Sequence, residues 1–185
     1  MCSSDLKCPY SIIDVCASPG GKSLLAMRAL PKSTLHANET IGKRVGALKE
    51  NLERCGISAT VTSMDPKILA DIQGPVFDIV IADVPCSGQS LLVRGIDNPG
   101  CFHDVNVSKN TGRQRRIAAE CVRLCKQGGI IAYSTCTYTQ SENEGVVEWL
   151  LGKHPECSTV AIPLLRDRKS TRLNSSHTVI SYAVF

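Results

Sequence analysis

The sequence predicts a doubly wound α/β fold, in which a mostly parallel sheet carries helices on both faces. Three observations support this. Between residues 11 and 157, short apolar runs alternate with helical patterns in the order of repeated strand–helix units. The apolar runs are rich in β-branched residues, which is typical of strands buried on both faces. Helix stop signals follow three of the helical patterns, at Pro31, Gly56 and Gly128–Gly129.

Each predicted element rests on its local pattern of apolar residues. We expect strands at Ser11–Cys16, Thr34–Asn38, Ala59–Ser63, Phe77–Asp83 and Gly129–Tyr133. We expect helices at Lys22–Leu30, Gly42–Cys55, Gly112–Lys126 and Ser141–His154. Ligands of such folds bind outside the carboxyl ends of the strands, so the functional site should lie there.

Composition excludes several classes of protein. Of the 185 residues, 43% are hydrophobic and 21% are charged, which is typical of one globular domain and not of a disordered or fibrous chain. No apolar run approaches the ~20 residues of a membrane span, and no secretory leader is recognisable. The ten cysteines lie within apolar runs, so most should be reduced thiols. We expect a cytoplasmic monomer.

The net charge of +4 is distributed unevenly. Residues 166–185 contain four basic side chains and one acidic one, so the preceding chain is nearly neutral. A local basic cluster occurs within one stretch of eighteen residues: Lys109, Arg113, Arg115, Arg116, Arg123 and Lys126. This cluster could bind nucleic acid, or it could be the solvated face of a helix.

A glycine-rich loop follows the first strand and opens a helix. Backbone N–H groups in such a loop approach a ligand closely, and the helix N-terminus favours a negative group. We therefore expect a nucleotide-like cofactor at Cys16, Ala17, Ser18, Pro19, Gly20, Gly21 and Lys22. The ending Gly-Gly-Lys-Ser resembles a P-loop, but that motif requires glycine at position 16, which is cysteine here.

Two acidic residues stand near the ends of the next strands. Glu39 follows the loop by about twenty residues, the position from which a carboxylate reaches ribose hydroxyls; alternatively it is an exposed acid capping the next helix. Asp65 follows the third strand and could reach an adenine edge. The alternative for Asp65 is a simple Asp-Pro turn.

The fourth and fifth strands bring reactive side chains to the same edge of the sheet. Asp83 and Cys86 follow the fourth strand, and Cys136 follows the fifth, so all three should meet beside the cofactor loop. Other cysteines should only pack: Cys55, Cys101, Cys121, Cys125 and Cys157. Cys121 and Cys125 have helical i, i+4 spacing, but no second ligand pair accompanies them, so we expect no metal site.

Four motifs in this order resemble the RNA cytosine-5 methyltransferases of the RsmB/NOP/Sun group: CASPGGK, DVPCSG, YSTCT and the following SENE. The resemblance covers about residues 11–165. It implies a class I, Rossmann-like methyltransferase that transfers a methyl group from S-adenosylmethionine to C5 of a cytosine in ribosomal or transfer RNA. A less favoured implication is an inactive remnant that only binds cofactor or RNA.

The resemblance also assigns roles. Residues 16–22, Glu39, Asp65 and Asp83 would bind the cofactor. Cys136 would add to C6 of the base, Cys86 would assist product release, and Asp83 would bond the base edge. DNA cytosine methyltransferases use a Pro-Cys cysteine instead, which is the rival assignment for Cys86. The target base should be single-stranded or flipped, and phosphates would be held by Arg94, Lys109, Arg113, Arg115 and Arg116.

Both ends depart from the family pattern. We expect residues 1–10 to be a ragged, non-native start and residues 166–185 a non-native tail, leaving 11–165 as an incomplete catalytic domain of weak or no activity. Thr159–Leu164 could form a sixth strand. No family-like seventh strand follows, which would leave the fifth strand as an open edge. Only the β-prone segment Thr178–Phe185 could fill that gap.

Overall fold

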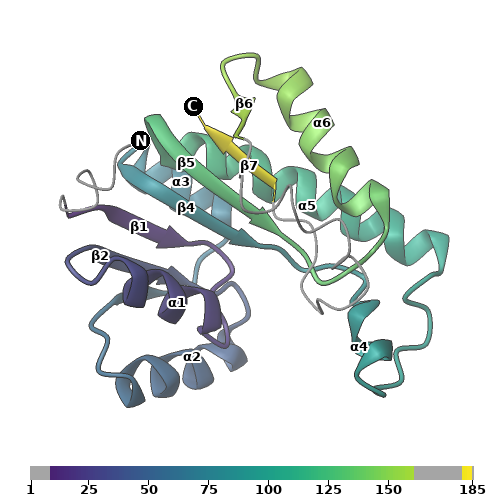
Figure 1. Cartoon of the computed structure of the whole chain (residues 1–185), viewed down its shortest axis with the longest axis horizontal. Coiled ribbons are helices and arrows are strands. Elements are labelled where there is room, and N and C mark those ends of the chain that lie inside the picture. Colours follow the sequence, from purple (N-terminus) through teal and green to yellow (C-terminus); the bar gives the residue numbers. More distant parts are fainter. Residues whose placement is uncertain (1–8, 161–180, 185) are drawn as a thin grey trace.

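The computed structural model describes residues 9–160 and the backbone of 181–184, and its centre is a seven-stranded sheet (Figure 1). The strands are β1 Ser11–Asp14, β2 Thr34–Asn38, β3 Thr60–Thr62, β4 Phe77–Asp83, β5 Cys125–Ser134, β6 Ser158–Thr159 and β7 Ser181–Val184. Their order is β3-β2-β1-β4-β5-β7-β6. The first five strands are parallel, and β7 runs antiparallel to both of its neighbours.

Helices fill the crossovers between the strands. They are α1 Gly21–Ala29, α2 Gly42–Arg54, α3 Pro66–Gln73, α4 Ser90–Val93, α5 Asp104–Leu124 and α6 Glu144–Lys153, with a short 3₁₀ turn, η2, at Gln140–Glu142. Across the described part of the chain, none of these helices has the length and apolar character to span a membrane.

The core lies on both faces of the sheet, which confirms the doubly wound α/β prediction. On one face, Ile13 and Val80 pack with apolar residues of α3, α5 and α6. On the other face, Ile12 and Ile81 pack with residues of α1 and α2. Neighbouring residues of β1 and β4 thus point to opposite faces, as the two-residue period of a strand requires.

Two of the five predicted strands have the predicted boundaries. Thr34–Asn38 and Phe77–Asp83 are strands over the predicted residues, whereas the first and third strands are shorter than predicted. The prediction for the fifth strand was wrong at its start. Helix α5 ends at Leu124, and residues from Cys125 onward already belong to β5, with a register shift opposite Phe77 and Ile79.

Gly129 marks this irregular start of β5. A Cβ atom at this position would lie 2.7 Å from Cys125 Sγ and 2.9 Å from Lys126 O. The close approach leaves room for glycine only, so the Gly-Gly pair permits a bulge in the strand and does not terminate the helix as predicted.

Two helices have no counterpart among the predictions. Asp65 is the N-cap of α3: its carboxylate accepts the Lys67 N–H at 2.9 Å, and Pro66 occupies the first helical position. Both are standard helix-start signals, so the Asp-Pro turn proves to be the beginning of a helix. The four-residue helix α4 and the eight residues of α5 before Gly112 were also missed.

The β-prone C-terminal segment does occupy the gap beside β5. Residues Ser181–Val184 form β7, which pairs with β5 from Ile130 to Tyr133 and with β6. The expectation of an open edge on β5 is therefore wrong. Strand β6 covers Ser158–Thr159, and residues 161–164 of the predicted sixth strand lie outside the described residues.

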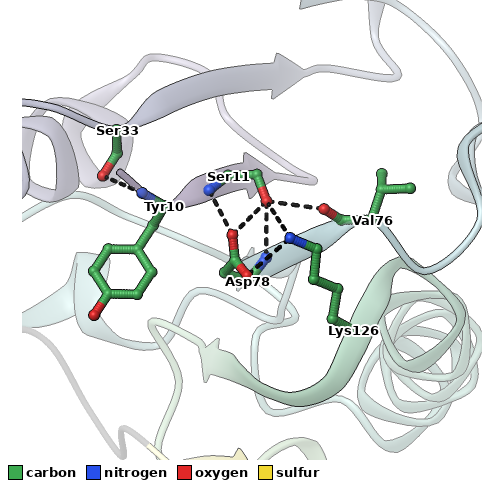
Figure 2. Close-up of polar contacts among 6 residues, drawn as sticks. All are labelled: Tyr10, Ser11, Ser33, Val76, Asp78 and Lys126. Carbon is green, nitrogen blue, oxygen red and sulfur yellow. Dashed lines mark hydrogen bonds and ion pairs between the residues drawn. The ribbon is translucent and has the colours of Figure 1, made fainter. Parts of the chain in front are cut away.

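Polar contacts join three strands at the amino-terminal edge of the sheet (Figure 2). Asp78 of β4 accepts the Ser11 N–H at 2.8 Å and the Ser11 hydroxyl at 2.6 Å, both at Oδ2. Its Oδ1 atom accepts from Lys126 Nζ of β5 at 2.9 Å. This cluster fixes the edge opposite the strand ends at which the predicted site residues lie.

Candidate active site

The glycine-rich loop lies between β1 and α1 at the carboxyl edge of the sheet. The Ala17 N–H donates to Asn38 O at 2.8 Å, which ties the loop to the end of β2. Gly20 has a φ of 110°, and a Cβ atom there would lie 3.3 Å from Leu48 Cδ1. Both this conformation and the close approach of Leu48 favour glycine at the residue that precedes α1.

Asp14, the last residue of β1, is buried directly beneath this loop. Its Oδ2 atom accepts the Ser23 hydroxyl at 2.6 Å, while Oδ1 has no hydrogen-bond partner among the described residues. Burial raises the pKa of Asp14 to about 6, against the opposing effect of the Ser23 hydrogen bond. Sequence reasoning overlooked Asp14; a carboxylate ending an apolar strand was the available signal.

Glu39 is buried, which contradicts the alternative that it is an exposed acid. Its Oε1 atom accepts the Ile41 N–H at 2.8 Å, and its Oε2 atom lies 3.4 Å from Arg44 Nη1 without accepting a hydrogen bond. Arg44 also donates to Ser18 O at 2.6 Å, and thereby links Glu39 to the loop. Arg44 was not among the predicted site residues.

Asp83 ends β4 beside the loop. Its Oδ2 atom lies 2.6 Å from Lys22 Nζ, and its Oδ1 atom accepts the Ser134 hydroxyl at 2.9 Å. Asp83 and Ser134 are register partners in β4 and β5. Asp83 of β4 therefore contacts both Lys22 of the loop and Ser134 of β5.

The two predicted thiols are in contact. Cys86 Sγ and Cys136 Sγ are 3.1 Å apart, and the Cys136 N–H donates to Cys86 Sγ at 3.3 Å. With the Cys86 thiol as the donor, this contact lowers the pKa of Cys136, and a hydrogen bond from Ser90 acts in the same direction. The same contact, together with burial, raises the pKa of Cys86. The pair thus favours a thiolate on Cys136.

The predicted phosphate-binding residues separate into two groups. Arg94, Lys109, Arg113 and Arg116 are exposed and form no ion pair within the described part of the chain. Arg115 instead lies over the Trp149 ring of α6, at 5.7 Å from its centroid. The two remaining cationic residues of the cluster are paired with carboxylates: Arg123 with Asp71 and Glu120, and Lys126 with Asp78.

Two exposed aromatic side chains lie close in sequence to the predicted site residues. Phe102 is 66% exposed and Tyr138 is 50% exposed. Gln89 connects their segments, because it donates to Cys101 O at 3.2 Å and accepts the Tyr138 N–H at 2.9 Å. The sequence analysis assigned neither aromatic residue to the site, although both lie close in sequence to its motifs.

Most of the other cysteines pack in the interior. Cys101, Cys121, Cys125 and Cys157 are buried, as expected, but Cys55 is exposed. Cys125 opens β5, so it and Cys121 do not share a helix as predicted. Residues 9–160 and 181–184 contain no group of three or more His, Cys, Asp or Glu side chains that could hold a metal ion.

Comparisons with known proteins support the motif resemblance. A family model described as 16S rRNA methyltransferase RsmB/F matches residues 5–181. Ribosomal RNA small subunit methyltransferase F of Klebsiella pneumoniae is 32% identical over 158 residues, or 84% of this chain and 33% of that protein. The Escherichia coli protein of the same name is 32% identical over 155 residues, or 83% of this chain and 32% of its own. The chain thus spans about a third of these relatives.

Solved structures show the same fold. NSun6 from Pyrococcus horikoshii, crystallised with SFG, matches with a TM-score of 0.73 at 21% identity, over 97% of this chain and 48% of that chain. TYW2 from P. horikoshii in complex with MeSAdo matches with a TM-score of 0.59 at 16% identity, over 96% and 57% of the two chains. At these identities the likeness establishes a class I, Rossmann-like fold. Because the family model matches residues 5–181, the chain belongs to the RsmB/F family of 16S rRNA methyltransferases.

Proposed function

We propose that the complete protein transfers a methyl group from S-adenosylmethionine to C5 of a cytosine in RNA, through a covalent adduct with Cys136. The observation that carries this proposal is the contact between two thiols, 3.1 Å apart, beside the Lys22–Asp83 pair. Cytosine C5 is a poor nucleophile, and addition of a thiolate to C6 makes C5 electron-rich. A site that favours a thiolate on Cys136 suits this chemistry.

The cofactor would lie over the loop formed by residues 16–22. Two buried carboxylate atoms near this loop, Asp14 Oδ1 and Glu39 Oε2, have no hydrogen-bond partner among the described residues. Such acceptors fit the ammonium and ribose hydroxyl groups of S-adenosylmethionine. Asp65 would contact the adenine edge, although its carboxylate also caps α3. The similar folds were crystallised with the S-adenosylmethionine analogues SFG and MeSAdo, which supports this cofactor.

In the proposed reaction, the cofactor supplies an electrophilic methyl group on a sulfonium. Cys136 Sγ would bond to C6, and the electron pair displaced to C5 would bond to that methyl group as its bond to sulfur breaks, which leaves the cofactor as a neutral thioether. Asp83 bonds the base edge and stabilises the protonated ring. Loss of the C5 proton to a base would then restore the C5–C6 double bond and expel Cys136 as a thiolate, and Cys86 would assist this release by donating a hydrogen bond to the leaving thiolate.

The substrate would be single-stranded RNA or a flipped base, because C6 is inaccessible within a stacked helix. Arg94, Lys109, Arg113 and Arg116 are free to contact phosphates, and Phe102 and Tyr138 could stack on unpaired bases. We propose ribosomal RNA as the substrate before transfer RNA, since the relatives are named for the small-subunit ribosomal RNA. We further propose a cytoplasmic monomer whose native part is residues 11–165.

Trapping on 5-fluorocytosine tests the nucleophile assignment. Fluorine at C5 cannot leave as a proton does, so an RNA carrying 5-fluorocytosine should form a denaturation-resistant adduct in the presence of S-adenosylmethionine. The adduct should disappear in Cys136→Ala and persist in Cys86→Ala. The opposite pattern would assign the nucleophile to Cys86. Titration calorimetry with S-adenosylmethionine is the accompanying control, and binding without any adduct would favour the inactive-remnant alternative.

A further inference from the structure

Glu142 is fully buried at the end of η2, next to the segment Pro85–Ser87 that contains Cys86. Its Oε1 atom accepts two hydrogen bonds, from the Ser87 N–H at 2.9 Å and from Gln114 Nε2 at 2.8 Å. Gln114, which is also fully buried, donates from the same nitrogen to Pro85 O at 2.9 Å. Two side chains from α5 and η2 thereby bond to the main chain on both sides of Cys86.

These bonds restrain the direction of the Cys86 side chain. Pro85 O belongs to the peptide group that precedes Cys86, and the Ser87 N–H belongs to the one that follows it. With both peptide groups fixed, the Cys86 Cα–Cβ bond has little freedom to turn away from Cys136. A further hydrogen bond joins Ser87 Oγ to Thr137 Oγ1 at 2.7 Å, so the two thiol-bearing segments are tied together.

We propose that Glu142 and Gln114 are positioning residues, which hold Cys86 in hydrogen-bond contact with Cys136 and so set the reactivity of the nucleophile. The inference rests on the proposed function of the two thiols. Neither residue reaches the reacting atoms; both act through the Pro85–Ser87 main chain.

The cost of this arrangement argues for a role beyond packing. Glu142 Oε2 and Gln114 Oε1 are buried and have no hydrogen-bond partner among the described residues. An apolar pair of similar volume would fill this space without leaving unpaired polar atoms. An apolar pair could not form hydrogen bonds with Pro85 O and the Ser87 N–H, which are the groups that orient Cys86.

The test measures the reaction of Cys136 with iodoacetamide between pH 5 and 10, followed by mass spectrometry of the peptide. Glu142→Ala removes the acceptor and should raise the midpoint of the labelling curve by about one pH unit, since Cys136 loses its thiol donor. Gln114→Met keeps the volume but loses both bonds and should shift the midpoint the same way. Glu142→Gln retains an acceptor and should stay near the parent value. The charged groups that act on Cys136, Lys22 and Asp83, remain in every variant.

Asp78→Ala is the matched control, because Asp78 also accepts a backbone N–H and a side-chain amine, at the opposite edge of the sheet (Figure 2). It should lower the melting temperature without moving the Cys136 midpoint. Unchanged midpoints in folded Glu142→Ala and Gln114→Met, or an equal shift in Asp78→Ala, would overturn the inference. Labelling requires neither cofactor nor RNA, so failure of the proposed function would appear separately, as absent S-adenosylmethionine binding.

Discussion

The buried carboxyl of Asp14 should make the stability of this fold depend on pH in an unusual direction. Its pKa is about 6 in the folded chain, against 3.8 for an unperturbed aspartate, because burial disfavours the charged form. The folded state therefore holds this proton more tightly than the unfolded state does. The contribution of this proton to the free energy of unfolding is fully present below pH 3.8 and is lost as the pH rises through 6. A shift of about two units corresponds to about 3 kcal/mol at neutral pH.

Asp14→Asn removes the titration while keeping an acceptor for the Ser23 hydroxyl. The amide places an unpaired N–H₂ group where Oδ1 now lies, which adds a constant cost of about 1–3 kcal/mol. The diagnostic quantity is thus the change with pH. Between pH 4 and pH 7, the free energy of unfolding of the variant relative to the parent should rise by about 2 kcal/mol.

Urea unfolding of both proteins at several pH values measures this change. Ser23→Ala serves as a second probe: it removes a hydrogen bond that lowers the Asp14 pKa, so the pH dependence should extend to higher pH. Curves for parent and Asp14→Asn that run parallel from pH 4 to pH 7 would refute the reasoning. In that case the Asp14 carboxylate would be solvated or paired in the folded protein.

Three further predictions test the fold and the basic residues of α5. Gly129→Ala should lower the free energy of unfolding by about 1–3 kcal/mol, because its Cβ would meet Cys125 Sγ at 2.7 Å; chemical denaturation measures the loss. Arg113→Ala should weaken RNA binding and reduce the salt slope by about 0.7, whereas Arg115→Ala should lower the melting temperature and leave the slope unchanged. Asp78→Asn should destabilise the fold by about 1 kcal/mol at pH 7. Hydrogen bonds to Ser11 and Lys126 outweigh burial and hold the Asp78 pKa below its usual value, so this loss should vanish as the pH falls below 3.8.

Sequence patterns predicted the fold where burial on both faces left an unambiguous apolar run. Phe77–Asp83 lies at the centre of the sheet and has the predicted boundaries. Helix α3 was missed because an Asp-Pro pair is common in turns, and the choice between a turn and a helix start depends on the residues that follow. Positions such as Leu69, which packs in the core, carry that information.

Part of the candidate site was predictable from strand order alone. The pairing of Asp83 with Ser134 places the segments that follow β4 and β5 side by side, and Cys86 and Cys136 lie on those segments. The position of Arg115 was not predictable by this means. Successive residues on a helix turn by about 100°, so one member of a basic run can face a neighbouring helix while the others face solvent.

Buried polar atoms without a hydrogen-bond partner are more frequent near the carboxyl edge of the sheet than elsewhere in the described residues. Among the described residues, six buried side-chain atoms lack a hydrogen-bond partner, and four of them surround the loop and the thiols: Asp14 Oδ1, Glu39 Oε2, Gln114 Oε1 and Glu142 Oε2. At the opposite edge, both carboxylate oxygens of Asp78 are bonded. Each unpaired buried atom lowers stability by about 1–3 kcal/mol, so their concentration at one edge is not expected from folding alone. Of these four atoms, Asp14 Oδ1 and Glu39 Oε2 lie near the glycine-rich loop, where hydrogen bonds from a bound ligand would restore part of this stability.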